Sequence, residues 1–136
     1  MTALGEKEAQ ILISLLEKMT GYYRVILELS RAEYDKFSRD RPIVEVLPIM
    51  KRRKILHSCI EELREESRPY IEMWNKGACS DEEKNKKIRN FLAQIEEGIK
   101  ESLLVSDKNQ IFLEKHIEKL ARDKVLFDKE IKKTKS

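Results

Sequence analysis

The chain of 136 residues has a size typical of a single domain, and its 39% charged and 7% aromatic residues, with 4 Gly and 3 Pro, favour long helices. Its formal net charge of +3 selects neither nucleic acid nor any other class of partner. The N-terminus has no basic segment before an apolar run, and no apolar stretch approaches the ~20 residues of a membrane span, so neither a signal peptide nor membrane insertion is expected.

The first helix is predicted from about Glu6 to Ser38. One face of it repeats at steps of three and four residues, close to a heptad rhythm. The positions on that face are Leu12, Leu16, Met19, Tyr23, Ile26, Ser30, Glu33 and Phe37. Gly21 costs the helix about 1 kcal/mol relative to Ala, and a glycine between packed helices often marks their close approach.

The second helix follows a break at residues 38–42. Pro42 disfavours helical geometry at the residue before it and suits the first turn of a new helix, which begins near Ile43 or only near Pro48. Pro69 is expected to kink or break this helix. Its apolar positions are Leu47, Met50, Leu56, Ile60, Leu63, Tyr70 and Trp74. We expect the last two aromatics to cap one end of the bundle, with a recognition patch as the alternative.

The third helix has a start signal at residues 80–83, where Ser80 and Glu83 can form a capping box. Its apolar positions are Ile88, Leu92, Ile95, Ile99 and Leu103. The same steps continue through the polar patch of Ser102, Ser106 and Asn109, which predicts one long helix. A break near Ser106 would instead produce a fourth helix.

The most informative feature lies in residues 106–136. Large apolar residues share one narrow face there, and a lysine lies within it. We call this face the C-terminal stripe, and its members are Leu113, Ile117, Leu120, Lys124, Phe127 and Ile131. A weaker apolar strip of Ile111, Val125 and Leu126 lies on the far side. Residues 115–136 carry eight Lys or Arg and four Asp or Glu, an excess of +4.

Three interpretations of the C-terminal stripe follow. It binds a helix of another protein, it packs against the first two helices, or it forms the seam of a homodimer. Because Lys124 lies within the stripe and the segment ends in a basic tail, we favour an interface that opens to a partner.

The chain carries no recognisable catalytic constellation. It has no glycine-rich phosphate loop, and neither His57 nor His116 has the Glu three residues earlier that a helical di-iron site requires. Both histidines are expected at the surface. Cys59 and Cys79 have no Cys or His at metal-ligand spacing, which favours free thiols in a cytoplasmic protein over a disulfide. We predict no enzymatic activity, no metal and no other cofactor.

The densest basic run is residues 51–54, Lys-Arg-Arg-Lys. Such a run can contact phosphates, but four consecutive residues point all around a helix. We therefore interpret it as a solvated helix face and expect no nucleic-acid partner, in keeping with the low aromatic content.

Together the elements predict one all-α domain over residues 1–136. It would be an elongated, coiled-coil-like antiparallel three-helix bundle, with two shorter helices packed on a longer C-terminal one, or a four-helix bundle if the chain breaks near Ser106. Residues 106–136 would form the amphipathic C-terminal helix, whose order without a partner the sequence leaves open. The protein would be a monomer or a weak homodimer.

The pattern as a whole resembles the FlgN-type flagellar export chaperones and, more distantly, their FliT-type relatives. Three stretches carry the likeness, and together they span most of the chain: residues 12–17 with 22–23, 26–29 and Glu33, then residues 47–56 with 60–63, and finally residues 109–113. The chain departs from the family in having Ser106 where a second Asn is usual, and in Pro48 and Pro69.

The resemblance implies a cytosolic all-helical protein that escorts flagellar subunits to the type III export machinery. It also implies that the C-terminal helix binds the C-terminal segments of hook-associated proteins, which maps onto the C-terminal stripe and would prevent premature assembly of the client. A homo-oligomeric structural coiled coil and a small helical regulatory adaptor are the competing functions.

Overall fold

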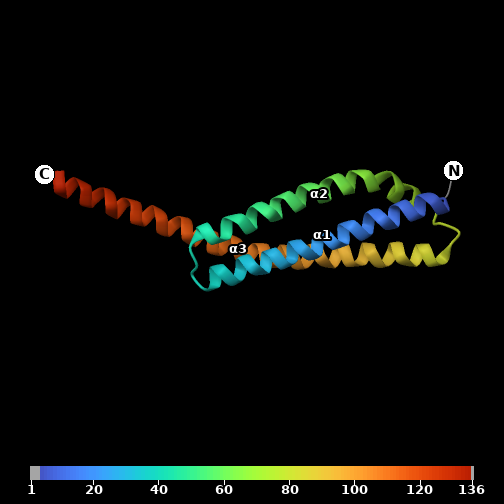
Figure 1. The fold of residues 1–136 in the computed structure, drawn as a ribbon, viewed down its shortest axis with the longest axis horizontal. Coiled ribbons are helices and arrows are strands. Elements are labelled where there is room, and N and C mark those ends of the chain that lie inside the picture. The colour runs from blue at the N-terminus through green and yellow to red at the C-terminus, as the bar shows by residue number, and fades with distance from the viewer. Residues whose placement is uncertain (1–3, 136) are drawn as a thin grey trace.

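The computed structural model describes residues 4–135, with side chains as far as Lys133. It consists of three helices: α1 spans Glu6–Ser38, α2 spans Ile43–Lys76 and α3 spans Glu82–Lys135. Consecutive helices run in opposite directions along one long axis (Figure 1). No strand occurs among the described residues, which confirms the predicted all-α three-helix bundle.

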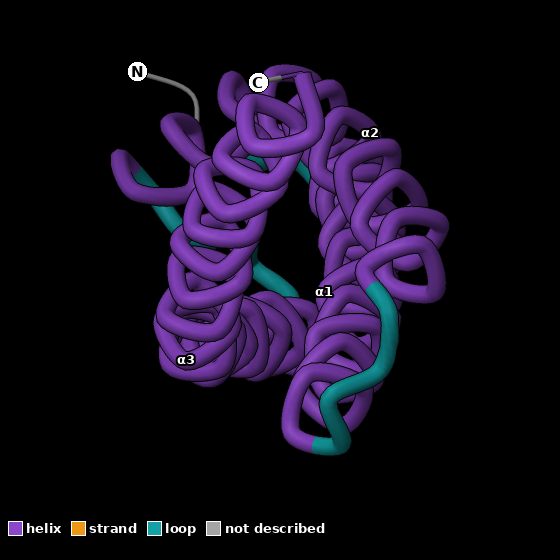
Figure 2. Tube along the Cα trace, turned by 90° about the vertical axis from the view of Figure 1, so that its left-hand side faces the viewer, coloured by secondary structure: helices purple, strands orange, loops and turns teal. Residues whose placement is uncertain are grey.

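The central helix is α1. Both α2 and α3 pack against it, but no Cα atom of α2 lies within 8 Å of a Cα atom of α3. Figure 2, which looks at the end of the bundle, shows α2 and α3 on different sides of α1. The prediction that two shorter helices pack on the C-terminal one is therefore wrong in its packing order. The physical reason is that α1 has a buried face wide enough for two neighbours.

All eight positions predicted for the packed face of α1 are buried. Leu12, Leu16 and Ile26 share one apolar core with Ile60 of α2 and Ile88 of α3. This core occupies the half of the bundle that contains the N-terminus. Farther along α1 the same face continues with polar residues, and these form a separate buried layer described below.

Gly21 does not mark a close approach of helices, contrary to the prediction. A Cβ atom built at Gly21 has no neighbour within 4 Å beyond its own local backbone. The tight position is Gly98 of α3, where an added Cβ atom would lie 3.4 Å from the Cβ atom of Tyr23. The glycine that matters for packing is therefore on the partner helix.

The turn between α1 and α2 depends on Asp40, which has a positive φ of 54°. The Arg41 amide donates to the Lys36 carbonyl at 3.0 Å, the long hydrogen bond of a Schellman cap. Pro42 then precedes the first residue of α2 and accepts a hydrogen bond from the Glu45 amide at 3.0 Å. Of the two predicted starts of the second helix, the one at Ile43 is confirmed.

Helix α2 continues through both Pro48 and Pro69. Each proline removes one backbone donor, but the helix does not end at either residue. Its course is arched over α1 rather than straight (Figure 1). Trp74 and Tyr70 pack against the core near the end of this helix, where they cap the bundle as expected.

The start of α3 is capped by Asp81 rather than by Ser80. The Asp81 carboxylate accepts from the Glu83 amide at 3.0 Å and from the Lys84 amide at 3.4 Å. The N-cap is therefore one residue later than predicted, and the capping box of Ser80 and Glu83 does not form among the described hydrogen bonds, since both Ser and Asp suit an N-cap. Asn85, 2% exposed, then fixes the loop by donating to the Cys79 carbonyl at 2.6 Å and accepting from the Trp74 indole at 3.1 Å.

Helix α3 is unbroken at Ser106, which confirms the single long helix predicted for this region and contradicts the four-helix alternative. At ~1.5 Å per residue, its 54 residues measure roughly 80 Å. Its C-terminal portion projects beyond the ends of the other two helices (Figure 1). Along the described residues no helix is both long and apolar enough to cross a membrane, and Cys59 and Cys79 are free thiols.

Candidate partner-binding surface

The C-terminal stripe lies on the part of α3 that extends past the bundle. Ile117 is 56% exposed, Leu120 54% and Phe127 62%. Lys124 is exposed between them, while Ile131 is 37% exposed and Leu113, at the root of the projection, is half-buried. Of the three interpretations, packing of the stripe against α1 and α2 is therefore contradicted for these three central positions.

The stripe continues the packing face of α3. The steps of three and four residues that place Ile88, Ile95 and Asn109 against α1 continue in phase to Leu113, Ile117 and Leu120. Helix α1 ends at Ser38, so the face passes the end of its neighbour while its sequence pattern persists. The stripe therefore has the residue pattern of a packed helix face, but its three central apolar residues, Ile117, Leu120 and Phe127, are exposed and not covered by another helix.

Aromatic contacts anchor the root of the projection. The ring of Phe112 lies edge-on to Tyr34 with centroids 5.7 Å apart, and it stacks on Phe37 at 5.9 Å. The Lys108 ammonium lies 5.7 Å from the centre of the Tyr34 ring. These contacts fix the direction in which α3 leaves the bundle, so the stripe is held on a supported helix rather than on a loop.

Acidic side chains border the stripe on both edges. By helical spacing, Glu114 and Asp128 lie along one edge, and Asp123 and Glu130 lie along the other. All four residues are exposed. The stripe is therefore an apolar seam with one central cation and four acidic side chains along its borders, where Lys119 and Lys132 also lie. The excess of acidic over basic border residues suits an amphipathic helix with basic flanks.

A buried polar layer crosses the bundle below the projection. Glu33 of α1 is 1% exposed and forms an ion pair with Arg53 of α2, with 2.9 Å between carboxylate oxygen and Nε. Asn109 of α3 donates to the other oxygen of Glu33 at 3.2 Å and to the Ser30 carbonyl at 3.0 Å. Burial raises the pKa of Glu33 above its ordinary value, although Arg53 and Asn109 oppose the change.

The polar layer was only partly visible in the sequence. Periodicity placed Ser30 and Glu33 on the buried face of α1, but the basic run 51–54 was interpreted as wholly solvated. Arg53 instead turns inward, while Lys51, Arg52 and Lys54 are exposed. The one signal that could have identified the pair is the carboxylate at a core position, which requires a cation nearby.

A groove of ≈ 230 Å³ lies above this layer between α2 and α3. Its walls include Ser30, Arg53, His57 and Ser102. Partial desolvation of the imidazole in this groove and the nearby Arg53 guanidinium lower the pKa of His57. Within the described side chains no hydrogen bond joins His57 to a hydroxyl or carboxylate, so the groove does not assemble a nucleophile and its base.

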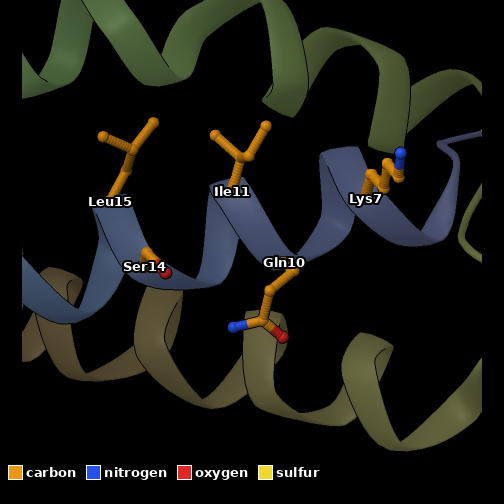
Figure 3. Close-up of a pocket in the computed structure, with 5 residues that line it drawn as sticks. All are labelled: Lys7, Gln10, Ile11, Ser14 and Leu15. Carbon is orange, nitrogen blue, oxygen red and sulfur yellow. The ribbon is translucent and has the colours of Figure 1, made fainter.

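A second hollow, lined by residues of α1, is shallow and mostly apolar. Figure 3 shows Ile11 and Leu15 pointing toward α2, and Gln10 pointing toward α3. Lys7 is the only charged residue that lines it. Its lining offers neither a nucleophile paired with a base nor a set of metal ligands.

The histidines occupy different settings. His57 is exposed as predicted, whereas His116 is half-buried beside Phe37, where α3 leaves the bundle. Within residues 4–135 no group of three or more His, Cys, Asp and Glu side chains could hold a metal ion.

Comparisons of this chain with protein-family models, with curated proteins and with solved structures find no match.

Proposed function

We propose that this protein is a cytoplasmic export chaperone, without enzymatic activity, that binds amphipathic C-terminal helices of flagellar hook-associated proteins through the C-terminal stripe. The observation that carries the proposal is the exposure of Ile117, Leu120 and Phe127 on a helix face that continues the packing face of the bundle. The resemblance of the sequence to FlgN-type chaperones supplies the class of client.

The physical basis is pairing of two amphipathic helices. Fully burying a large apolar side chain contributes roughly 1.5–3 kcal/mol, and the stripe presents several such side chains along one line. Part of this gain offsets the entropy lost on association. Since the same apolar face of the client would otherwise pair with further client molecules, covering it prevents premature assembly.

The charge pattern adds selectivity. The acidic borders of the stripe favour a client helix with Lys or Arg beside its apolar face, and they oppose one with acidic flanks. Lys124 at the centre requires either a carboxylate in the client or access to water. When a client is bound, the stripe is covered, and when the chaperone is free, the stripe is exposed. The export machinery can distinguish the two forms by this difference.

The test is a calorimetric titration with a C-terminal fragment of a hook-associated protein. The variant Leu120→Ala/Phe127→Ala should weaken binding at least tenfold, because the loss of two large apolar contacts exceeds ~1.4 kcal/mol. The matched control is Ile111→Ala/Leu126→Ala on the opposite face, where the two residues are 54% and 59% exposed. Equal loss in both variants, or unchanged affinity in the first, contradicts the proposal.

A homo-oligomeric coiled coil is the second candidate, and the heptad spacing within the stripe supports it. Leu113, Leu120 and Phe127 are seven residues apart, as are Ile117, Lys124 and Ile131. A single polar residue in such a seam sets register and oligomeric state. Analytical ultracentrifugation without client separates the two: an obligate dimer favours the coiled coil, and a monomer that associates only with the client fragment favours the chaperone.

A further inference from the structure

The face of α3 opposite the C-terminal stripe has an organisation of its own. Lys115, Arg122 and Lys129 follow one another at seven-residue intervals and form what we call the basic face. The strip of Ile111, Val125 and Leu126 accompanies it, with exposed fractions of 54%, 53% and 59%. The projecting helix therefore carries two amphipathic faces of different charge, since the stripe has acidic borders and the opposite side is basic.

The cations of the basic face have no ionic partners within the described part of the chain. None of the three forms an ion pair there, although Glu118 lies between the first two along the helix. Some arginines elsewhere on the surface are paired, Arg64 with Glu61 at 3.0 Å and Arg68 with Glu65 at 2.6 Å. Other surface cations among the described side chains are unpaired as well, so the basic face is distinguished by its seven-residue spacing and not by the absence of ion pairs alone. The basic face therefore presents charge that the protein itself does not neutralise.

The spacing of the basic face indicates the shape of the complementary surface. A strict seven-residue interval drifts by ~20° per heptad on a straight α-helix, which traces a left-handed path. A second helix winding in a left-handed coiled coil follows that path over its whole length. On a flat anionic bilayer, Glu118, which lies beside this path, would face the lipid headgroups and be repelled by them.

We propose that the basic face docks an acidic amphipathic helix of a partner protein, with carboxylates at seven-residue spacing and apolar residues that cover Ile111, Val125 and Leu126. Helix α3 is then held between two helices, with the client on the stripe and the acidic helix on the opposite side. This inference goes beyond the proposed function, because the basic face shares no residue with the stripe and the acidic helix need not be a client.

The probe is a synthetic acidic peptide of about three heptads, with Glu at the seven-residue positions and Leu at the accompanying apolar positions. Fluorescence anisotropy should show binding to the full chain that weakens as salt rises from about 50 to 200 mM, because exposed charges are screened. The variant Lys115→Glu/Arg122→Glu/Lys129→Glu should lose binding at least tenfold, since three attractive pairs become repulsive. The uncharged variant K115Q/R122Q/K129Q should lose less.

The matched control makes the same change in net charge at a distant part of the chain. The variant Lys18→Glu/Lys86→Glu/Lys87→Glu replaces three exposed lysines of the bundle, none of which is ion-paired within residues 4–133. It should bind the acidic peptide within about twofold of the unmodified chain, because these sites lie several Debye lengths of ~10 Å from the basic face. Circular dichroism establishes that each variant remains helical.

Three results would overturn the inference. The first is equal loss of binding in the control variant, and the second is equal binding of a peptide with Gln in place of Glu. The third is binding to vesicles of phosphatidylcholine and phosphatidylglycerol with no binding to the acidic peptide, which would assign the face to a membrane surface.

The outcome is distinguishable from failure of the chaperone function. The variant K115E/R122E/K129E should retain its affinity for the hook-associated fragment, and Leu120→Ala/Phe127→Ala should retain its affinity for the acidic peptide. Peptide binding without client binding rejects the client and keeps the basic face. The reverse keeps the client and rejects the docking helix.

Discussion

At the scale of single residues, the polar layer of Glu33, Arg53 and Asn109 is the most demanding feature of the bundle. A carboxylate that is 1% exposed loses most of its hydration, and among the described side chains the Arg53 guanidinium and the Asn109 amide compensate for that loss. Because the three residues come from three different helices, the layer fixes how α2 and α3 are aligned on α1. We therefore interpret the layer mainly as a device that selects one alignment of the helices, and less as a source of net stabilisation.

Replacing Arg53 by Ala should destabilise the protein by about 2–4 kcal/mol, since it leaves the buried Glu33 carboxylate without its cation. Arg52→Ala is the matched control, because Arg52 is the exposed neighbour in the same basic run. It should change the free energy of unfolding by less than about 0.5 kcal/mol. Urea denaturation of both variants gives the comparison, and equal effects would show that the Glu33–Arg53 pair is unimportant.

The raised pKa of Glu33 makes a prediction about pH. A carboxyl group whose folded-state pKa lies above its unfolded value binds protons more tightly when folded, so its stabilising contribution is present at low pH. That contribution is lost as the pH rises from the ordinary value of 4.5 through the raised pKa. Relative to Glu33→Gln, the unmodified protein should therefore lose free energy of unfolding across this window. A difference that is flat or rises with pH, measured by urea titration, contradicts the sign.

At the scale of helices, the sequence specified more than the bounds of each element. Every position that the phase of α1 placed on the packed face is buried, including the polar Ser30 and Glu33, but the buried face is wider than predicted. It also takes in Ala9, Ile13, Leu15 and Thr20. The phase could not identify the neighbour of each face, because periodicity reports which side is buried and not what covers it. The N-cap at Asp81 was also missed, because the sequence offers two adjacent residues, Ser80 and Asp81, that cap a helix about equally well. Which of the two caps α3 depends on the path of the loop before it, and the sequence pattern does not report that path.

Gly21→Ala should stabilise α1 by about 0.5–1 kcal/mol, because alanine improves helix propensity and nothing lies within 4 Å of the new Cβ atom. Gly98→Ala gains the same propensity but places its Cβ atom 3.4 Å from that of Tyr23, so its net gain should be smaller. Thermal unfolding of both variants tests the pair. A larger gain at Gly98 would mean that α1 and α3 are less closely packed there than the structure shows.

At the scale of the whole molecule, the protein combines a packed bundle with a projecting helix. The sequence revealed the phase of the C-terminal stripe, because Leu113, Ile117 and Leu120 continue the steps of the packed face. It could not reveal their exposure, which depends on where α1 ends relative to α3. The stripe and the basic face both lie on the projection, so the two proposed docking surfaces and the packed core belong to different parts of the chain.

This separation predicts that damage to the stripe spares the fold. Leu120→Ala/Phe127→Ala removes side chains that are already more than half exposed, so the midpoint of thermal unfolding should fall by no more than about 2 °C. Differential scanning calorimetry of this variant and the unmodified chain provides the measurement. A fall comparable to that caused by Arg53→Ala would place the stripe within the cooperative core.

The central claim is that a client helix binds the C-terminal stripe of an otherwise unchanged bundle. Amide hydrogen exchange of the full chain, with and without a C-terminal fragment of a hook-associated protein, tests it most directly. A projecting helix with few tertiary contacts opens at low free energy and should exchange fast when free. We predict that the fragment slows exchange at residues 113–131 and leaves residues 6–38 and 43–76 unchanged. Protection confined to α1 and α2, or none at 113–131 with fragment bound, would contradict the account.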